Sequence, residues 1–281
     1  FAQWCVFGLA RENGVTVLLD GQGSDEQLGG YGGAITTAFL RELLARGRFR
    51  SWFKERKLAQ QAQGRSFDWP HALIASLGVP GLEAGIRRVR RGIVFRDLLD
   101  ADWVRETLGA LPELPERDNP KRAVGITLWT LTFRTMLSSL LRFGDRLSMA
   151  HSREVRLPFC DHRIAEFAFG LAPELLVGEG QAKGVLRKAI DGLVPPEIVH
   201  RAKQGFQPPQ DEWVQGLHRA LTADLLTAPG PVAEIMDRRR MLRSGDTGDA
   251  SVRWQLLNTL CWSRHSLERM RALPHISATL S

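Results

Sequence analysis

Residues 15–26, which read VTVLLDGQGSDE, decide the predicted fold class of this 281-residue chain. Val15 to Leu19 are apolar or β-branched, as in a strand that is buried on both faces of a parallel sheet. Gly14 ends the helix-like stretch before this run, and Asp20 begins a polar loop rich in glycine. In open α/β sheets, ligands bind in the loops that follow the carboxyl ends of strands. The stretch therefore predicts an α/β fold with a ligand site in the loop after the strand.

Outside this stretch the chain is predicted to be almost entirely helical, with few parallel strands. Apolar residues recur at helical spacing in several segments, and each stripe predicts a helix surface that faces the core. The stripes are Phe1/Cys5/Leu9, Ile35/Phe39/Leu43, Ile126/Trp129/Phe133/Leu137/Leu140, Ile164/Phe167/Ala168/Leu171 and Leu186/Ala189/Ile190/Leu193. A last apolar helix is predicted over Arg253–Leu267, residues 110–120 as a Pro-rich surface connection, and residues 229–249 as an irregular excursion.

The composition indicates a globular chain, because 43% of the residues are hydrophobic and 25% are charged. Lysines and arginines exceed acidic residues by 38 to 31, which gives a formal charge of +7. The excess is concentrated in Arg46–Lys57, Arg87–Arg91 and Arg238–Arg243. No helix-turn-helix, zinc-finger or RNA-binding signature accompanies these runs, so we interpret them as solvated helix surfaces and expect no nucleic-acid partner.

The three cysteines, Cys5, Cys160 and Cys261, lie far apart, and the seven histidines never pair at metal-ligand spacing. Neither a disulfide framework nor a zinc site is predicted, and a reducing, cytoplasmic compartment is expected. No apolar stretch approaches the ~18–20 residues of a membrane span, and no signal peptide opens the chain. A soluble protein without a membrane partner is therefore expected.

The first cluster of chemically competent residues is Gly21–Glu26, with Gly29, Gly30 and Tyr31 behind it. Glycines at a strand-to-helix turn let backbone N–H groups approach an anionic ligand. The carboxylates of Asp25 and Glu26 can hold Mg²⁺, a hard ion that prefers oxygen ligands. A tight turn without a ligand accounts for the glycines equally well.

The second cluster extends from Leu140 to Asp161 and alternates charged with apolar residues. Its charged members could form an ion-pair network that holds the walls of a site, and such networks are as often structural as catalytic. They are Arg142, Asp145, Arg146, Glu154 and Arg156.

The third cluster consists of Lys183, Gly184 and Arg187, followed by Arg201–Phe206, which contains Lys203. Lys183 and Lys203 lie beside glycines on either side of an amphipathic helix. Flexible point charges of this kind can meet a departing polyphosphate, although a surface loop explains them as well.

The residues of the three clusters, and the order of the clusters along the chain, together resemble the asparagine synthetase family. The synthetase domain of this family shares the Rossmann-like adenine-nucleotide α-hydrolase fold. The resemblance extends from Arg11 to Trp262 and is weakest from Gln60 to Pro120. It implies ATP-dependent amidation of a carboxylate, aspartate first of all, through an acyl-adenylate. ATP and Mg²⁺ are the implied cofactors, and ammonia derived from glutamine is the implied nitrogen donor.

The resemblance also implies roles for individual residues. Asp20 and Gly21 match positions whose backbone meets ATP, Asp25 matches a magnesium-binding acid, and Lys183 and Lys203 match lysines that meet pyrophosphate. The implied catalytic residues are Gln22, Lys183 and Lys203, and the implied nucleotide-binding residues are Asp20, Gly21, Gly23, Ser24 and Asp25.

Gln22 departs from the family pattern, since well-studied asparagine synthetases have a Glu involved in amidation at this position. An amide cannot accept a proton from attacking ammonia as a carboxylate can, which leaves the acceptor and the proton route open. The alternatives are a β-lactam-synthetase-like cyclase or a sugar-acid amidotransferase. A non-catalytic, helical nucleic-acid-binding protein is a more distant alternative, suggested by the arginine runs alone.

The Ser-Gly-Gly-x-Asp-Ser phosphate loop and the amino-terminal glutaminase of the family do not occur in these 281 residues, and Phe1 begins directly in an apolar stretch. Residues 1–281 are therefore expected to be the carboxy-terminal part of one asparagine-synthetase-type domain. We expect this part not to turn over alone and the full-length protein to form a homodimer.

Overall fold

The computed structural model describes residues 1–63 and 119–201, and in addition residues 102, 106, 208, 209, 212, 213 and part of 254–266. The chain divides into two compact units, Phe1–Ile86 with Leu114–Gly205 and Arg87–Glu113 with Phe206–Ser281. The first unit holds both long described ranges. In the second unit, the described residues within 254–266 are helical, as predicted for the last helix. The predicted excursion at 229–249 and most of the predicted connection at 110–120 lie outside the described residues.

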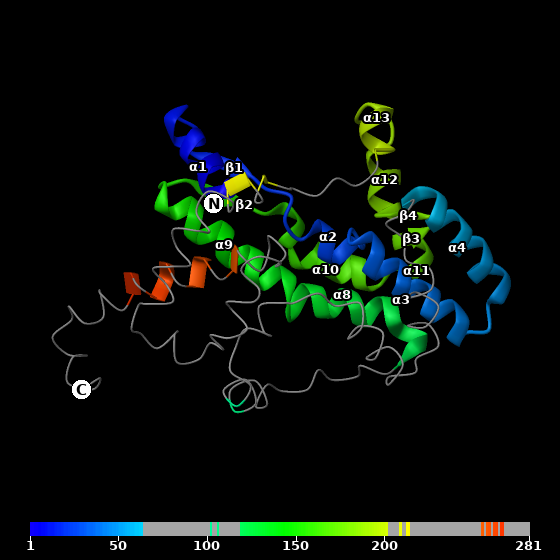
Figure 1. The fold of residues 1–281 in the computed structure, drawn as a ribbon. Coiled ribbons are helices and arrows are strands. Elements are labelled where there is room, and N and C mark those ends of the chain that lie inside the picture. The colour runs from blue at the N-terminus through cyan, green and yellow to red at the C-terminus, as the bar shows by residue number, and fades with distance from the viewer. Residues whose placement is uncertain are drawn as a thin grey trace. The chain divides into compact units, whose positions relative to one another are not determined.

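In its described residues the first unit is mainly helical, and these residues form two small sheets of two strands each (Figure 1). Its helices are α1 (Ala2–Glu12), α2 (Ser24–Leu28), α3 (Gly32–Ala45), α4 (Phe49–Gln63), α8 (Ala123–Phe133), α9 (Met136–Ala150), α10 (His162–Phe169), α11 (Pro173–Leu176), α12 (Gly184–Ile190) and α13 (Pro196–Val199). Short 3₁₀ helices are η3 (Pro120–Arg122) and η4 (Pro158–Cys160), and the strands are β1 (Val17–Leu19), β2 (Glu154–Arg156), β3 (Val177–Gly178) and β4 (Gln181–Ala182).

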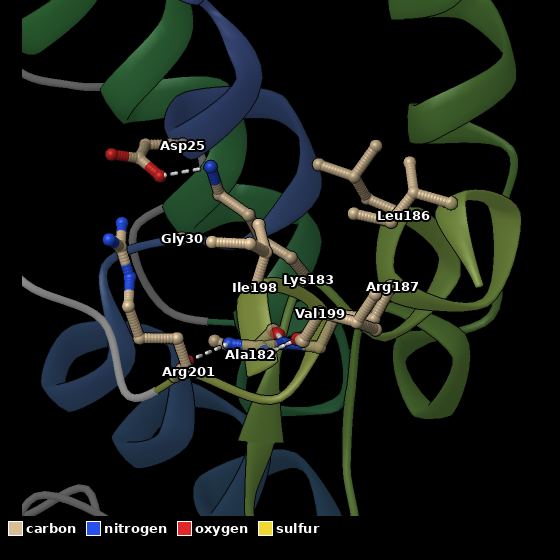
Figure 2. A pocket seen from close by; sticks show the side chains of 10 residues that line it. Asp25, Gly30, Ala182, Lys183, Leu186, Arg187, Ile198, Val199 and Arg201 are labelled. Atoms are coloured by element: carbon tan, nitrogen blue, oxygen red, sulfur yellow. Dashed lines mark hydrogen bonds and ion pairs between the residues drawn. The ribbon is translucent and has the colours of Figure 1, made fainter. Parts of the chain in front are cut away.

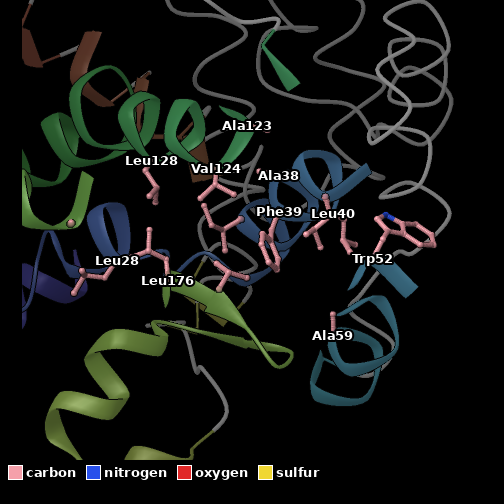
Figure 3. Close-up of a cluster of buried hydrophobic side chains, with 14 residues drawn as sticks. Leu28, Ala38, Phe39, Leu40, Trp52, Ala59, Ala123, Val124, Leu128 and Leu176 are labelled. Carbon is pink, nitrogen blue, oxygen red and sulfur yellow. The ribbon is translucent and has the colours of Figure 1, made fainter. Parts of the chain in front are cut away.

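The hydrophobic core lies where α3 packs against α8, with α2, α4 and α11 around them (Figure 3). Ile35, Phe39 and Leu43 of α3 are all buried, which confirms the stripe predicted for this helix. Val124 and Leu128 of α8 meet them in the same cluster. Burial of such side chains contributes roughly 1.5–3 kcal/mol each, so this contact is the main stabilising element of the unit.

Four predicted stripes are wrong in detail. In two of them, Phe167 is 56% exposed and Leu193 is 78% exposed, although both residues were predicted to face the core. The stripe from Ile126 to Leu140 was predicted as one helix surface, but the helix breaks between α8 and α9, where the N–H groups of Arg134 and Thr135 both bond to the Thr130 carbonyl. Phe133 is therefore 54% exposed among the described residues. In α1 the helix is confirmed, whereas its buried residue is Phe7 and not a member of the Phe1/Cys5/Leu9 stripe.

One helical stretch in the described residues, Pro120–Ala150, is long and apolar enough to cross a membrane by length and composition. The sequence analysis expected no such stretch, and that expectation is wrong on this criterion. Core helices of soluble proteins pass the same test. Here the stretch is interrupted at Arg134 and Thr135, and α8 contacts α2 and α3 while α9 contacts α1 and β2.

The strand predicted at Val15–Leu19 forms as β1 and pairs in parallel with β2, which confirms the parallel arrangement. The register places Val17 opposite Glu154 and Leu19 opposite Arg156. The prediction that this strand is buried on both faces is wrong, because Val17 is 40% exposed and Leu19 is 76% exposed within the described residues. The pairing brings residues 17–19 and 154–156 together and thereby sets the direction of the loop that follows β1.

Strands β3 and β4 form an antiparallel hairpin that the sequence analysis did not anticipate. Its two turn residues, Glu179 and Gly180, both have positive φ, 55° and 74°, as in the two-residue turns that match strand twist. The hairpin packs against α3, and Lys183 follows directly after β4. The position of Lys183 is thus determined by a hairpin attached to the core.

Candidate active site

The loop after β1 forms a turn whose geometry requires glycine at position 23. Asp20 N–H donates to the Arg156 carbonyl at 2.9 Å, which continues the strand pairing by one residue. Gly23 then has a φ of 95°, a conformation that residues with a side chain rarely adopt. A Cβ at this position would also lie 3.0 Å from Cys160 Sγ. The turn therefore leads the chain from β1 into α2 by a route that only glycine permits.

The buried side chain of Glu26 stabilises the turn through hydrogen bonds. Its side chain is 1% exposed, and its two carboxylate oxygens accept hydrogen bonds from Gly23 N–H at 3.2 Å and from the Tyr31 hydroxyl at 2.5 Å. Burial, followed by the hydrogen bond and charge of Glu26, raises the pKa of the Tyr31 phenol well above its usual range, so the phenol remains a donor. Both oxygens of Glu26 therefore serve the fold, which favours Asp25 over Glu26 as the acid for Mg²⁺.

Asp25 and Lys183 form an ion pair, with 2.5 Å between Asp25 Oδ1 and Lys183 Nζ. The ammonium of Lys183 also donates to Ser24 Oγ at 2.9 Å. Lys183 reaches this position from the start of α12 with a φ of 59°, which is unusual for a residue with a side chain. Residues from the first and third clusters, 158 positions apart, are thus brought into direct contact.

Gly30 makes room for this ion pair. A Cβ at position 30 would lie 1.9 Å from Asp25 Oδ1 and 2.5 Å from Lys183 Cε, closer than van der Waals contact allows. The Gly30 N–H donates to the Asp25 carbonyl at 2.7 Å and holds the backbone against the pair. From the sequence, Gly30 was predicted only as part of the first glycine-rich cluster, and the space that it leaves for the ion pair was not predicted.

The ion pair lies in a pocket of about 260 Å³, which we call the Asp25–Lys183 pocket (Figure 2). Its charged residues are one carboxylate, Asp25, and three cations, Lys183, Arg187 and Arg201. In Figure 2 the Lys183 ammonium points at Asp25, and the Arg201 guanidinium extends toward the same side. The remaining walls are Gly30, Ala182, Leu186, Ile190, Ile198 and Val199. The excess of cations favours an anionic ligand with the size of a few phosphate groups.

Gln22 and Asp20 line a second pocket, of about 160 Å³, on the side of the β1 turn that faces α9 and β2. Its other residues are Leu140, Leu141, Gly144, Asp145, Ser148, Met149, Glu154, Val155 and Leu157. We call it the Gln22 pocket. Gln22 and Lys183 therefore line different cavities, although the sequence analysis implied catalytic roles for both.

The ion-pair network predicted in the second cluster is largely absent from the described residues. Of its five members, only Glu154 and Arg156 form an ion pair, at 2.8 Å. The Arg142, Asp145 and Arg146 side chains form none there, and the walls of the Gln22 pocket are held by packing and strand pairing instead. Lys203 lies outside the described residues, so the structure does not place it.

Asp25 is the carboxylate that fits a magnesium ion in the Asp25–Lys183 pocket. Mg²⁺ is usually held by one or two carboxylates together with substrate phosphates, and Asp25 lies beside cations suited to phosphate. In the part of the chain that the structure describes, no group of three His, Cys, Asp or Glu side chains could hold a metal by itself. The donor set therefore fits a metal that arrives with an anionic ligand.

Comparison with known proteins identifies the family. Residues 1–265 match the family model described as asparagine synthase. The putative asparagine synthetase (glutamine-hydrolysing) of Mycobacterium bovis is 28% identical over 288 aligned residues, which cover 97% of this chain and 43% of that protein. Asparagine synthetase 3 (glutamine-hydrolysing) of Bacillus subtilis is 25% identical over 195 residues, 66% of this chain and 31% of that protein.

The amidase chry2 of Gibberella zeae is also similar, with 24% identity over 237 residues, 74% of this chain and 34% of that protein. The chain thus spans less than half the length of these curated relatives. No solved structure matches the chain. Because the family model matches 265 of 281 residues and one relative aligns over 97% of this chain, the chain belongs to the asparagine synthase family.

Proposed function

We propose that this chain carries the ATP-dependent, amide-forming chemistry of its family, with aspartate as the carboxylate substrate and asparagine as the product. The reaction passes through an acyl-adenylate with loss of pyrophosphate, and a glutaminase active site supplies the ammonia. Support for ATP-dependent amide formation comes from the family match. Support for the glutaminase comes from the relatives, which are named as glutamine-hydrolysing and extend well beyond the matched region.

The observation that carries the proposal is the Asp25–Lys183 ion pair at the turn after a parallel strand. It combines a carboxylate that fits Mg²⁺ with an ammonium in a pocket dominated by cations. Gly30 leaves the space that this contact needs, and the hairpin before Lys183 positions the lysine for it. A surface lysine would need neither the space left at position 30 nor the positive φ at its own position.

The residues of the pocket act on the leaving group. When the substrate carboxylate attacks the α-phosphorus, negative charge accumulates on the departing pyrophosphate. Lys183 donates to that charge and Arg201 adds a second cation, whereas Ser24 and Asp25 orient the lysine. Asp25 would hold a Mg²⁺ ion that arrives with the nucleotide, and this ion would supply further neutralisation of the polyphosphate. Loss of one well-placed donor of this kind typically costs ~10²–10³ in rate.

The proposal includes the remaining expectations for this chain. The β1 turn belongs to an adenine-nucleotide α-hydrolase-like fold, in which Asp20, Gly21, Gly23 and Ser24 meet ATP and Lys203 meets pyrophosphate together with Lys183. Gln22 lies at the amidation step, in the Gln22 pocket. Residues 1–281 form the carboxy-terminal part of one synthetase domain in a homodimeric, cytoplasmic enzyme.

The test is ATP–pyrophosphate exchange by the intact protein in the presence of aspartate. We expect exchange by the wild type and a loss of roughly 10²-fold or more in Lys183→Ala. Lys188→Ala is the matched control, because Lys188 is exposed on the same helix and does not line the pocket. Exchange that depends on no carboxylate, or equal rates in the two variants, would contradict the proposal.

The acceptor carboxylate is tested in the same assay. Gln22 replaces the Glu that the family resemblance implies, and one of the relatives is an amidase of another name. A panel of aspartate, β-amino acids and sugar acids therefore belongs in the exchange assay. A faster ATP–pyrophosphate exchange with aspartate than with the other carboxylates supports asparagine synthesis. A faster exchange with a β-amino acid or a sugar acid than with aspartate points to a cyclase-like or sugar-acid amidotransferase activity.

A further inference from the structure

Arg187 makes a set of contacts in the Asp25–Lys183 pocket that the proposed function does not use. Its guanidinium donates to three backbone carbonyls: from Nε to Ala182 at 2.9 Å, from Nη1 to Val199, and from Nη2 to Arg201 at 3.2 Å. All three donor nitrogens of the side chain are engaged. One side chain on α12 is thus bonded to two separate segments of the chain.

The two segments carry the other cations of the pocket. Ala182 ends strand β4 and directly precedes Lys183. Val199 ends helix α13, and Arg201 follows it by two residues. Both Lys183 and Arg201 line the pocket. Arg187 therefore links the backbone that presents one cation to the backbone that presents the other (Figure 2).

Physical chemistry explains why an arginine serves here. The last carbonyls of a helix have no partner within that helix, and α13 is only one turn long. A guanidinium offers five N–H groups in a planar fork and can bond to several carbonyls at once, whereas an ammonium is a compact point charge on a flexible stem. Within the described residues, Arg201 itself forms no ion pair, so the position of its charge depends on its backbone.

We propose that Arg187 is a positioning residue of the leaving-group site. It holds the Arg201 segment in register with the Lys183 turn, so that both cations meet the same anion. This inference rests on the proposed function for its anion, pyrophosphate.

The experiment compares Arg187→Lys and Arg187→Gln with Lys188→Gln in the intact protein, at a temperature where circular dichroism shows each variant folded. In ATP–pyrophosphate exchange, we expect kcat to fall by about 30- to 100-fold in both Arg187 variants, while KM for ATP changes by less than about threefold. Lysine should rescue no better than glutamine, because it keeps the charge but cannot bridge three carbonyls. Lys188→Gln should match the wild type.

A kcat of Arg187→Lys near the wild-type value would overturn the proposal, since charge alone would then suffice. If Arg187→Gln fails to fold, Arg187→Lys still decides, because it keeps the length and charge of the side chain. Calorimetric titration with pyrophosphate separates the two proposals. A wild type that binds pyrophosphate without exchange contradicts the proposed function alone. Unchanged pyrophosphate binding in both Arg187 variants, where we expect at least about tenfold weakening, contradicts the positioning role alone.

Discussion

Two buried glutamates in this unit have nearly the same exposure and different tasks. Glu26 in the β1 turn is 1% exposed, and Glu42 in the α3–α8 contact is 2% exposed. Glu26 accepts hydrogen bonds from Gly23 N–H and the Tyr31 hydroxyl, both within five residues of it. Glu42 accepts from Val124 N–H, at 3.1 Å, and pairs with Arg46.

The difference lies in what each carboxylate holds in place. Glu42 satisfies one of the first N–H groups of α8, which have no partner in their own helix, and its charge is favourable at that helix end. It therefore joins two core helices. Glu26 shapes the turn beside which Asp25 meets Lys183. Substitutions should thus separate a region whose geometry matters for chemistry from one that matters for stability alone.

The largest effect is expected for Gly30→Ala, because the added methyl group collides with the Asp25–Lys183 ion pair. We expect a loss of roughly 10²–10³-fold in ATP–pyrophosphate exchange, as for removal of a well-placed donor. Gly33→Ala is the matched control, since nothing lies within 4 Å of a Cβ at position 33 in the first turn of α3. It should leave exchange unchanged and raise the free energy of unfolding by about 0.5–1 kcal/mol. Equal exchange rates in the two variants would refute this view of the site.

The next largest effect is expected for Glu26→Gln. An amide has one acceptor oxygen, so it cannot accept from both Gly23 N–H and the Tyr31 hydroxyl, and one buried donor loses its partner. The free energy of unfolding should fall by about 1–3 kcal/mol, as measured by urea denaturation. Exchange per folded molecule should also fall, by about tenfold or more, because the turn that carries Asp25 shifts. If the variant loses stability but keeps its exchange rate, Glu26 matters for stability alone, as is expected for Glu42.

A smaller effect is expected for Glu42→Gln, the same substitution in the core region. The amide oxygen can still accept from Val124 N–H, and the Arg46 side chain, 41% exposed, can turn to solvent. Unfolding should become easier by about 1 kcal/mol in urea. The exchange rate per folded molecule should equal that of the wild type. A change in KM or kcat would show that the α3–α8 contact communicates with the pocket.

The smallest effect concerns pH. Burial raises the pKa of the Glu42 carboxyl above its ordinary value of 4.5, although the Val124 hydrogen bond and the Arg46 charge oppose this shift. Because the folded state then binds the proton more tightly than the unfolded state, this group lowers stability at neutral pH. The penalty is relieved as the pH falls through the raised pKa. The stability of the wild type relative to Glu42→Gln should therefore increase in urea titrations as the pH is lowered from neutral toward the ordinary value of 4.5. A constant difference would contradict the raised pKa.

An element of the fold could be predicted where it depends on interactions between residues that are close in sequence. The α3 stripe was predictable because helix periodicity is local and α3 is a continuous helix. The stripe across α8 and α9 failed because a two-residue break between the helices resets the phase of the pattern. For β1, parallel pairing was predictable from its apolar run, but its partner β2, with the sequence EVR, has no such signal. The β3–β4 hairpin has strands of two residues, which are too short to show a period.

The site shows the same division. Asp25 and Lys183 were both selected from sequence, and the structure brings them into contact, whereas their catalytic roles remain predictions. Glu26 was considered beside Asp25 as an acid that can hold Mg²⁺, because sequence does not reveal that its side chain turns inward to Tyr31. Gly30 and Arg187 received no individual role. Gly30 leaves space for a side chain about 150 residues away, and Arg187 bonds to carbonyls of other segments, and neither contact can be deduced from the order of residues.

The sequence by itself determined the family, the parallel strand with its polar loop, and which residue types are available for phosphate chemistry. These properties depend on the order of residues within short segments and on motifs that can be recognised without a structure. Only the tertiary structure decided which carboxylate faces the cations of the pocket, that Gln22 and Lys183 line separate pockets, and that Arg187 joins the segments of Lys183 and Arg201. The physical reason is that a side chain's role depends on its burial and partners. Both are set by contacts between residues far apart in sequence.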